Sequence, residues 1–269
     1  MKSTSLLLAA LLLSPSLAHA DRKDKKKIYV RAGVVEVNTS LAQSRPMELA
    51  DVDGPASLAV QNGPIDGSGA SVSSATTVGA IIGYQLPWKD GRLAIETVLG
   101  LPFTVKFQAT GTLATQSIAP MALGLPTGVG PLGPELGEAK AVPPVVTMVY
   151  SIGNSERIHP YVGGGVAVMF TTGAKVTNPM LTAVSQPNMS IAPAPGIVAQ
   201  AGIDAKLAKH VYARLDVKFI AGMLARARVE HIQVQTPDLP LFDTVEVGTA
   251  KMSMWVNPLI IQAGIGTDF

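Results

Sequence analysis

The stretch that decides the fold is HVYARLDVKFIAG, residues 210–222. Every second residue from Val211 to Phe219 is apolar, and the residues between them, from Tyr212 to Lys218, are polar or charged. Such strict alternation predicts a β-strand with one apolar and one polar face. A soluble sandwich would bury the apolar face in its core, whereas a membrane barrel would turn it to lipid and point the charges into the lumen.

The amino-terminal sequence MKSTSLLLAALLLSPSLAHA predicts export. Lys2 provides a positive start, and the apolar run at residues 6–13 is too short to span a bilayer. Ala18 and Ala20 form an A-x-A cleavage pattern. We therefore expect residues 1–20 to be a signal peptide and residues 21–269 to form one exported domain.

The composition narrows the possible classes of protein. The 269 residues include no cysteine and carry a formal net charge of +2. These values exclude a disulfide scaffold and thiol chemistry, and they give no indication of a nucleic-acid partner. Beyond residue 20, no apolar run approaches the roughly 20 residues of a spanning helix. A membrane-spanning form of this chain would have to be a closed barrel, because every backbone polar group in lipid must be hydrogen-bonded.

Seven further segments continue the pattern of alternation, and long and short connections follow one another between the segments. The eight segments lie near residues 28–37, 76–86, 93–106, 144–152, 160–171, 196–207, 211–225 and 251–269, and the long connections are residues 38–75, 107–143, 172–195 and 226–250. This pattern predicts an all-β fold, an eight-stranded antiparallel transmembrane β-barrel with long extracellular loops and short periplasmic turns. The alternation alone leaves open a soluble eight-stranded barrel with a charged exterior.

The polar faces of these segments predict the lining of the lumen. The expected lumen-facing residues are Arg31, Glu96, Gln200, Asp204, Lys206, Arg214, Asp216, Lys218 and Gln262. Both signs of charge occur among them, so they can pair inside the barrel. One arginine facing lipid near the midplane would instead cost about 2–4 kcal/mol. We expect Arg214, Asp216 and Lys218 to pair with groups such as Glu96, Asp204 and Arg31.

The carboxyl-terminal segment alternates as far as Phe269, the last residue. A final strand that ends on an aromatic residue resembles the signal that outer-membrane barrels present to their assembly machinery. Together with the signal peptide, this ending predicts a barrel in the outer membrane of a Gram-negative bacterium, with outer-membrane lipid and the barrel assembly machinery as partners.

Several segments resemble, in order, the successive strands of the OmpW/AlkL family. They are KIYVRAGVVEV, LAIETVLGLPF, AVPPVVTMVY, HPYVGGGVAV and WVNPLIIQAGIGTDF. The most specific are the paired prolines Pro143 and Pro144 before a strand, and PYVGGG at residues 160–165. The resemblance implies an eight-stranded barrel with a narrow, largely apolar passage for small hydrophobic molecules.

Pro102, Pro143 and Pro144 mark a candidate seam between the third and fourth expected strands. Proline cannot donate to the hydrogen-bond ladder and is normally kept to strand edges. The two strands are antiparallel neighbours, so we expect these prolines to face one another at similar height. They indicate either a bulge or early strand end, or a weakened seam through which an apolar solute could leave sideways into the membrane.

The sequence does not support an enzyme or a metal site. GVGPLG at residues 128–133 has the spacing of a phosphate-binding loop, but it follows no expected strand and opens no helix. The histidines at 159, 210 and 231 lack metal-ligand spacing, and G-x-S-x-G does not occur. We therefore expect no catalytic residue, no metal and no cofactor.

Two functions remain for such a barrel. The first is a passive conduit that collects a small hydrophobic solute at its loops and releases it laterally, above a charged lower lumen. The second is a structural or recognition barrel whose lumen is plugged and whose long loops bind a partner. The interior of eight strands is only wide enough for side chains or one small ligand, so neither function includes a wide aqueous pore.

Overall fold

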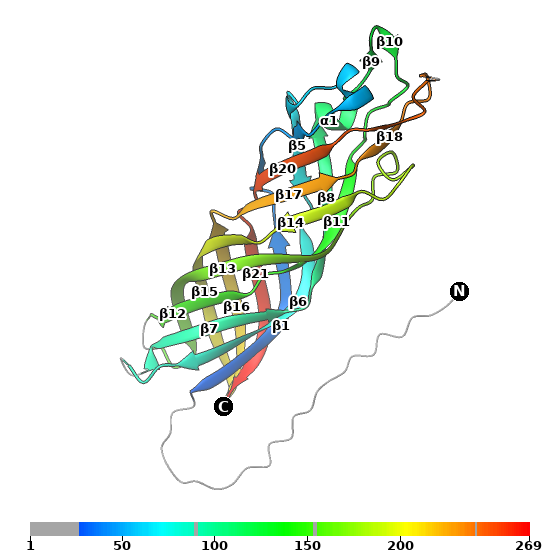
Figure 1. Ribbon diagram of the computed structural model, residues 1–269. Helices are drawn as coiled ribbons and strands as arrows, with labels where there is room; N and C mark the ends of the chain where they lie inside the picture. The colour runs from blue at the N-terminus through cyan, green and yellow to red at the C-terminus, as the bar shows by residue number, and fades with distance from the viewer. Residues whose placement is uncertain (1–26, 89–90, 153–154, 240) are drawn as a thin grey trace, which may run out of the picture.

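The computed structural model describes residues 27–88, 91–152, 155–239 and 241–269, so the expected signal peptide lies outside the described part. The strands that form the barrel are β1 (Ile28–Asn38), β6 (Ala75–Gln85), β7 (Leu93–Gly100), β12 (Val145–Ser151), β13 (Ile158–Val176), β15 (Ala194–Ala208), β16 (Val211–Ala221) and β21 (Leu259–Asp268). They are antiparallel and pair in this order, and the barrel closes because β21 pairs with β1 (Figure 1). The predicted eight-stranded antiparallel barrel is confirmed.

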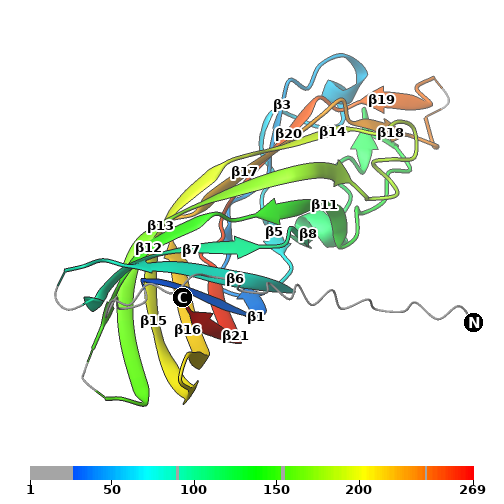
Figure 2. The ribbon, with the colours of Figure 1, turned by 90° about the horizontal axis from the view of Figure 1, so that it is seen from below.

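Further strands extend the barrel at the end away from the carboxyl terminus. They are β2 (Gln43–Ser44), β3 (Glu48–Ala50), β4 (Gly63–Pro64), β5 (Ser68–Val72), β8 (Phe103–Gly111), β9 (Met121–Ala122), β10 (Leu125–Pro126), β11 (Glu135–Val142), β14 (Asn188–Ala192), β17 (Leu224–Glu230), β18 (Gln233–Gln235), β19 (Thr244–Glu246) and β20 (Thr249–Trp255). Figures 1 and 2 show these strands as a long extension at one end of the barrel, here called the distal part. The opposite end of the barrel, with the short connections, is called the turn end. The segments expected as long loops therefore contain strands as well as loops.

The helices are short: η1 (Gly54–Leu58) and α1 (Thr112–Thr115) both belong to the distal part. Among the described residues, no helix has the length and apolar character required to cross a bilayer.

The barrel is apolar outside and charged inside. Every one of its eight strands exposes large apolar side chains on the outer face: Ile28, Val34, Val78, Ile82, Tyr84, Ile95, Leu99, Val146, Met148, Tyr150, Val162, Val166, Ile197, Ile203, Val211, Leu215, Ile261 and Ile265. On β16, Leu215 is exposed whereas its neighbours Arg214 and Asp216 are buried. An apolar belt that surrounds a charged interior fits lipid and not water. The orientation of the opening stretch, HVYARLDVKFIAG, is thus that of a membrane barrel.

Leu215 and Val211 lie at different depths of the apolar belt on the outer face of β16, so an arginine should destabilise the barrel to different extents at the two positions. Leu215→Arg should destabilise the barrel in a bilayer by about 2–4 kcal/mol, because the charge would face the middle of the belt. Val211→Arg places the same charge at the turn end of the same strand and should cost only about 0–1 kcal/mol. Urea titrations of the two variants refolded into lipid vesicles measure the difference, and equal losses would contradict this placement of the belt.

The strands break where the barrel passes into the distal part, a level here called the waist. The breaks lie at residues 39–42, 73–74, 101–102, 143–144, 193, 222–223 and 256–258, and four of the seven contain proline. The prediction of continuous strands at residues 93–106, 211–225 and 251–269 is therefore wrong, because each of them is interrupted at the waist. Proline removes a ladder donor and ends a strand, and Gly222 takes a φ of 75° that favours glycine. Only β13 runs through this level without a break.

Four of the breaks, at residues 73–74, 101–102, 193 and 222–223, reverse the face that points inward. In β7 the even-numbered Glu96 is buried, whereas in β8 the odd-numbered Phe107 is buried. The same reversal separates Lys218 in β16 from Ala225 in β17. Below the waist the chain turns its apolar face to lipid, and above the waist it turns that face to an internal core. At these four breaks the change of surroundings is accompanied by a shift in the strand phase, whereas across 143–144 and 256–258 the inward-facing positions keep their phase.

The interior is layered along the barrel axis. Near the turn end lies a small cluster that includes Tyr29 and Tyr161. An apolar cluster that includes Val35, Val145 and Ile220 lies inside the barrel just below the waist. A larger apolar core occupies the distal part and is formed by side chains from most of its strands. Among the described residues, the buried charged side chains are thus confined to the lower lumen, beneath a long and mainly apolar interior.

Candidate functional site

The lower lumen is filled by a network centred on Arg214. Its Nε and Nη2 donate to the two carboxylate oxygens of Asp204 at 2.7 and 2.8 Å, and its Nη1 donates to Glu96 Oε1 at 2.6 Å. The guanidinium also lies 4.6 Å from the ring centre of Tyr161. The Tyr29 hydroxyl donates to the same oxygen of Glu96 at 2.5 Å. A buried, bidentate arginine pair of this kind is among the strongest interactions that side chains form.

A second group of bonds surrounds Asp216. The Tyr161 hydroxyl and the Gln200 amide both donate to its Oδ2 at 2.6 Å, while the Lys218 ammonium pairs with its Oδ1. Gln200 also donates to Glu96 Oε2 at 2.8 Å. The glutamine therefore links the two groups into one network.

Arg31 completes the network at the turn end, where it pairs with Asp268 at 2.7 Å and with Asp204 at 3.7 Å. The buried members of the network are here called the charged plug: Arg31, Glu96, Gln200, Asp204, Arg214, Asp216 and Lys218. Buried charges of this kind are stable only while they stay paired. An apolar molecule that displaced them would leave charges unpaired, so the plug opposes its descent.

Above the plug, a gap between the strands β7 and β8 on one side and β11 and β12 on the other interrupts the hydrogen-bonded wall at the waist. The ladder between β7 and β12 ends at the pair Val98–Val145, and the ladder between β8 and β11 begins at Phe103–Ala141. Within the described residues, neither the ladders nor the other backbone hydrogen bonds join residues 99–102 to residues 142–144. This gap, here called the seam, contains Pro102, Pro143 and Pro144.

Two other breaks at the waist, at residues 222–223 and 256–258, are bridged by backbone hydrogen bonds. Ile220 N donates to Pro258 O at 3.0 Å, and Val256 N donates to Met223 O at 2.9 Å. On the far side of β12, Val168 N donates to Pro144 O at 3.1 Å. The seam differs from these breaks because both of its strands lose donors to proline at the same height.

A cavity of about 240 Å³ connects the upper lumen with the seam. Its lining includes Val35, Val37, Val98, Val145, Ile260, Lys218 and Gln262 from the lumen, and Leu99, Leu101, Pro143, Pro144 and Phe170 from the seam. Leu101 is 61% exposed and Leu99 is 56% exposed on the lipid side of the wall. The seam cavity is therefore an apolar space that reaches from the top of the charged plug to the outer surface of the barrel.

Smaller cavities continue through the distal part. One of about 40 Å³ shares Val37, Phe103, Pro143 and Ile260 with the seam cavity. The next, of about 60 Å³, lies within the distal core and is lined by residues that include Met180 and Met189. Packed apolar side chains separate these spaces. A solute that moved between them would have to displace side chains, but it would meet no buried charge among the described residues on the way.

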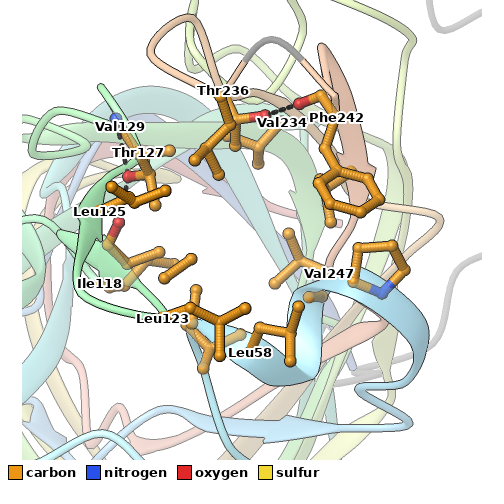
Figure 3. A pocket seen from close by; sticks show the side chains of 18 of the residues that line it. Leu58, Ile118, Leu123, Leu125, Thr127, Val129, Val234, Thr236, Phe242 and Val247 are labelled. Atoms are coloured by element: carbon orange, nitrogen blue, oxygen red, sulfur yellow. Dashed lines mark hydrogen bonds between the residues drawn. The ribbon is translucent and has the colours of Figure 1, made fainter.

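At the tip of the distal part, a pocket of about 210 Å³ opens among the loops (Figure 3). Leu58, Ile118, Leu123, Leu125, Val234, Phe242 and Val247 surround it in Figure 3. The two threonines in its lining satisfy their hydroxyls internally, since Thr127 donates to Ala119 O and Thr236 donates to Phe242 O. This distal pocket therefore presents an apolar surface. Its rim is open to water, where Leu241 is 90% exposed and Leu123 is 78% exposed.

The residues expected from sequence to line the lumen occupy these positions in the structure. Arg31, Glu96, Gln200, Asp204, Arg214, Asp216, Lys218 and Gln262 are buried inside the barrel. Lys206 is exposed, because the ladder shifts register between Lys206 and Ala208 at the end of β15. Pro102 and Pro144 are exposed at the seam, and Pro143 is half-buried.

Sequence reasoning missed two parts of this arrangement. Tyr29 and Tyr161 belong to the plug network, and their places on the inward faces, beside Arg31 and within PYVGGG, could have indicated it. The distal pocket offers no such signal. Its lining comes from loop segments far apart in the sequence, which have no periodicity.

Comparisons with known proteins agree with this architecture. A model of the OmpW family matches residues 47–269. The crystal structure of the outer-membrane protein OprG from Pseudomonas aeruginosa is 20% identical and has a TM-score of 0.67 over 91% of this chain and 96% of that chain. The AlkL structure in DMPC bilayers is 18% identical with a TM-score of 0.49, covering 96% of this chain and 97% of that chain.

The solution structure of the E. coli outer membrane protein W is 15% identical, with a TM-score of 0.46 over 92% of this chain and all of that chain. No curated protein sequence matches this chain. The likeness to OprG shows the fold, and the family model spans most of the sequence. The chain thus belongs to the OmpW family, and its barrel lies in the outer membrane of a Gram-negative bacterium.

Proposed function

We propose that this barrel gives passive passage to small hydrophobic molecules, which leave sideways into the membrane through the seam. The observation that carries the proposal is the seam cavity, which joins the apolar upper lumen to exposed side chains on the lipid side. The charged plug lies directly below this cavity. Continuing downward would require breaking buried ion pairs, whereas leaving sideways requires only apolar contacts.

The distal pocket is the proposed site of capture. Its apolar lining and open rim suit a solute that arrives from water, because burial of apolar surface is favourable by roughly 25 cal/mol per Å². From there the solute would pass through the distal core to the seam cavity. The flexible side chains of Met180 and Met189 in that core fit a path that opens transiently.

The carboxyl-terminal strand has a separate proposed role in assembly. β21 closes the barrel against β1, and Phe269 at its end is exposed while its backbone N–H donates to Ile28 O at 2.7 Å. An exposed terminal aromatic on the closing strand is suited to recognition by the barrel assembly machinery.

Uptake of a hydrocarbon such as octane by intact cells tests the proposal. Cells that contain the protein should take up octane faster than cells that lack it. Equal uptake would instead favour the alternative of a structural or recognition barrel with a plugged lumen, whose loops bind a partner.

A charge in the distal pocket should reduce this uptake. Leu125 lines the pocket and is exposed, so Leu125→Glu should fold, but it should weaken capture by about 1–3 kcal/mol because the carboxylate must be desolvated or must keep water in the pocket. Val184→Glu is the matched control, since Val184 is an exposed distal residue that does not line the pocket. Equal uptake rates in the two variants would contradict capture at this site.

A further inference from the structure

The seam cavity has a polar wall opposite its opening. Lys218 on β16 and Gln262 on β21 line it, and these strands lie across the barrel from β7 and β12, which form the seam. Most of the remaining lining is aliphatic or aromatic. The cavity therefore spans the lumen from two polar side chains at one end to the lipid side at the other.

Lys218 has hydrogen-bonding capacity that the protein does not use. It is 1% exposed, and among the described residues Asp216 is its only hydrogen-bond partner. An ammonium group carries three donors, and a buried donor without a partner is costly. Gln262 lies beside it and donates to Gly79 O at a long 3.3 Å. An ionisable residue at this depth in a membrane protein points to a ligand or pathway.

We propose that the seam cavity binds an apolar molecule with one uncharged oxygen acceptor, such as a medium-chain ketone, ester or alcohol. The oxygen accepts a hydrogen bond from the Lys218 ammonium, with the Gln262 amide beside it, and the hydrocarbon chain extends toward the seam. This inference rests on the proposed function of the cavity as the site of exit, and it adds the chemical class of the solute.

The charges in the lumen select against ionised head groups. The plug contains the cations Arg31, Arg214 and Lys218, and the anions Glu96, Asp204 and Asp216. Asp268 adds a further anion at the turn end. An ammonium head would be repelled by Lys218. A carboxylate would be attracted to Lys218 but repelled by Asp216, and it would add to the excess of four anions over three cations in a site of low dielectric. A neutral acceptor leaves this charge balance unchanged.

Binding of nonan-2-one, nonane and nonanoate to the purified protein in phospholipid nanodiscs tests the inference. Methyl NMR signals of Val98, Val145 and Ile260, which line the cavity, report occupancy without any transport. Nonan-2-one should shift these signals at a concentration about tenfold lower than nonane does, as expected for one hydrogen bond to a charged group. Nonanoate should not shift them in this concentration range.

A double variant separates the hydrogen bond from partitioning into lipid. Asp216→Asn combined with Lys218→Met removes both members of the buried pair together, so neither charge is left alone. The ratio of nonan-2-one to nonane affinity should fall about tenfold in this variant, because lipid partitioning is common to both proteins. Lys206→Met, at an exposed lysine, should keep the wild-type ratio.

The outcomes distinguish this inference from the proposed function. Equal ratios in the wild type and the double variant, or nonanoate binding as tightly as the ketone, would overturn the neutral-acceptor site and leave lateral passage untouched. Selective binding in nanodiscs together with unchanged cellular uptake would instead overturn the passage while the binding site stands.

Discussion

Uptake of a hydrophobic solute should fall by about tenfold or more when Gly100 is replaced by tryptophan, which corresponds to a barrier raised by at least about 1.4 kcal/mol. Gly100 ends β7, lines the seam cavity and is exposed. A Cβ atom at this position would have no neighbour within 4 Å. The Cβ atom of the new side chain therefore meets no clash with the backbone, and the indole should obstruct the cavity where it meets the lipid. The measurement is the initial rate of octane uptake per amount of folded protein.

Gly164→Trp is the control for this experiment. Gly164 is exposed on β13 in the apolar belt, and a Cβ atom there would meet only the carbonyl oxygen of Val198, at 3.4 Å. This variant adds the same side chain to the lipid face but leaves the seam open, so its uptake should match that of the wild type. A folded Gly100→Trp protein that transports at the wild-type rate would show that the solute does not leave through the seam.

Arg214→Leu should cause the largest loss of stability among single substitutions in the plug. The change leaves the buried carboxylates of Glu96 and Asp204 without the guanidinium that donates hydrogen bonds to them and balances their charge. Removal of one partner from a buried ion pair costs about 3–5 kcal/mol. The free energy of unfolding, from urea titration in lipid vesicles, measures the loss. Lys206→Leu, at an exposed lysine on the neighbouring strand, should change it by no more than about 0.5 kcal/mol. Similar stabilities of the two variants would mean that Arg214 does not hold the plug together.

The barrel could be predicted from sequence because its alternation is regular and its charges leave one acceptable orientation. Arg214, Asp216 and Lys218 share one face, and a lipid-facing arginine would cost about 2–4 kcal/mol. This energetic cost alone determines which face of β16 points into the lumen and which faces lipid. The pairing order then follows from antiparallel neighbours joined by alternating short and long connections.

The breaks at the waist could not be predicted by the same reasoning. Odd-numbered positions stay mainly apolar from Leu93 through Phe107 and from Val211 through Val229, so the periodicity continues across each break. What changes is the medium that this face meets, which is lipid along the barrel and a protein core in the distal part. Periodicity reports that a face is apolar, but it does not report what covers that face. The distal pocket could not be predicted from sequence for a related reason. Contacts between its loops depend on the packing of the whole distal part.

The reversal of faces at the waist determines where the chain can change its length. Residues inserted among the connections at the tip of the distal part leave the strands below in phase, and loops accept such changes at little cost. One residue inserted or deleted between β7 and β8 would instead turn Val105 and Phe107 out to water and bring the polar side chains of Thr104 and Lys106 into the core. Insertions and deletions among natural relatives should therefore accumulate at the tip. The number of residues between Leu99 and Phe103 should stay constant.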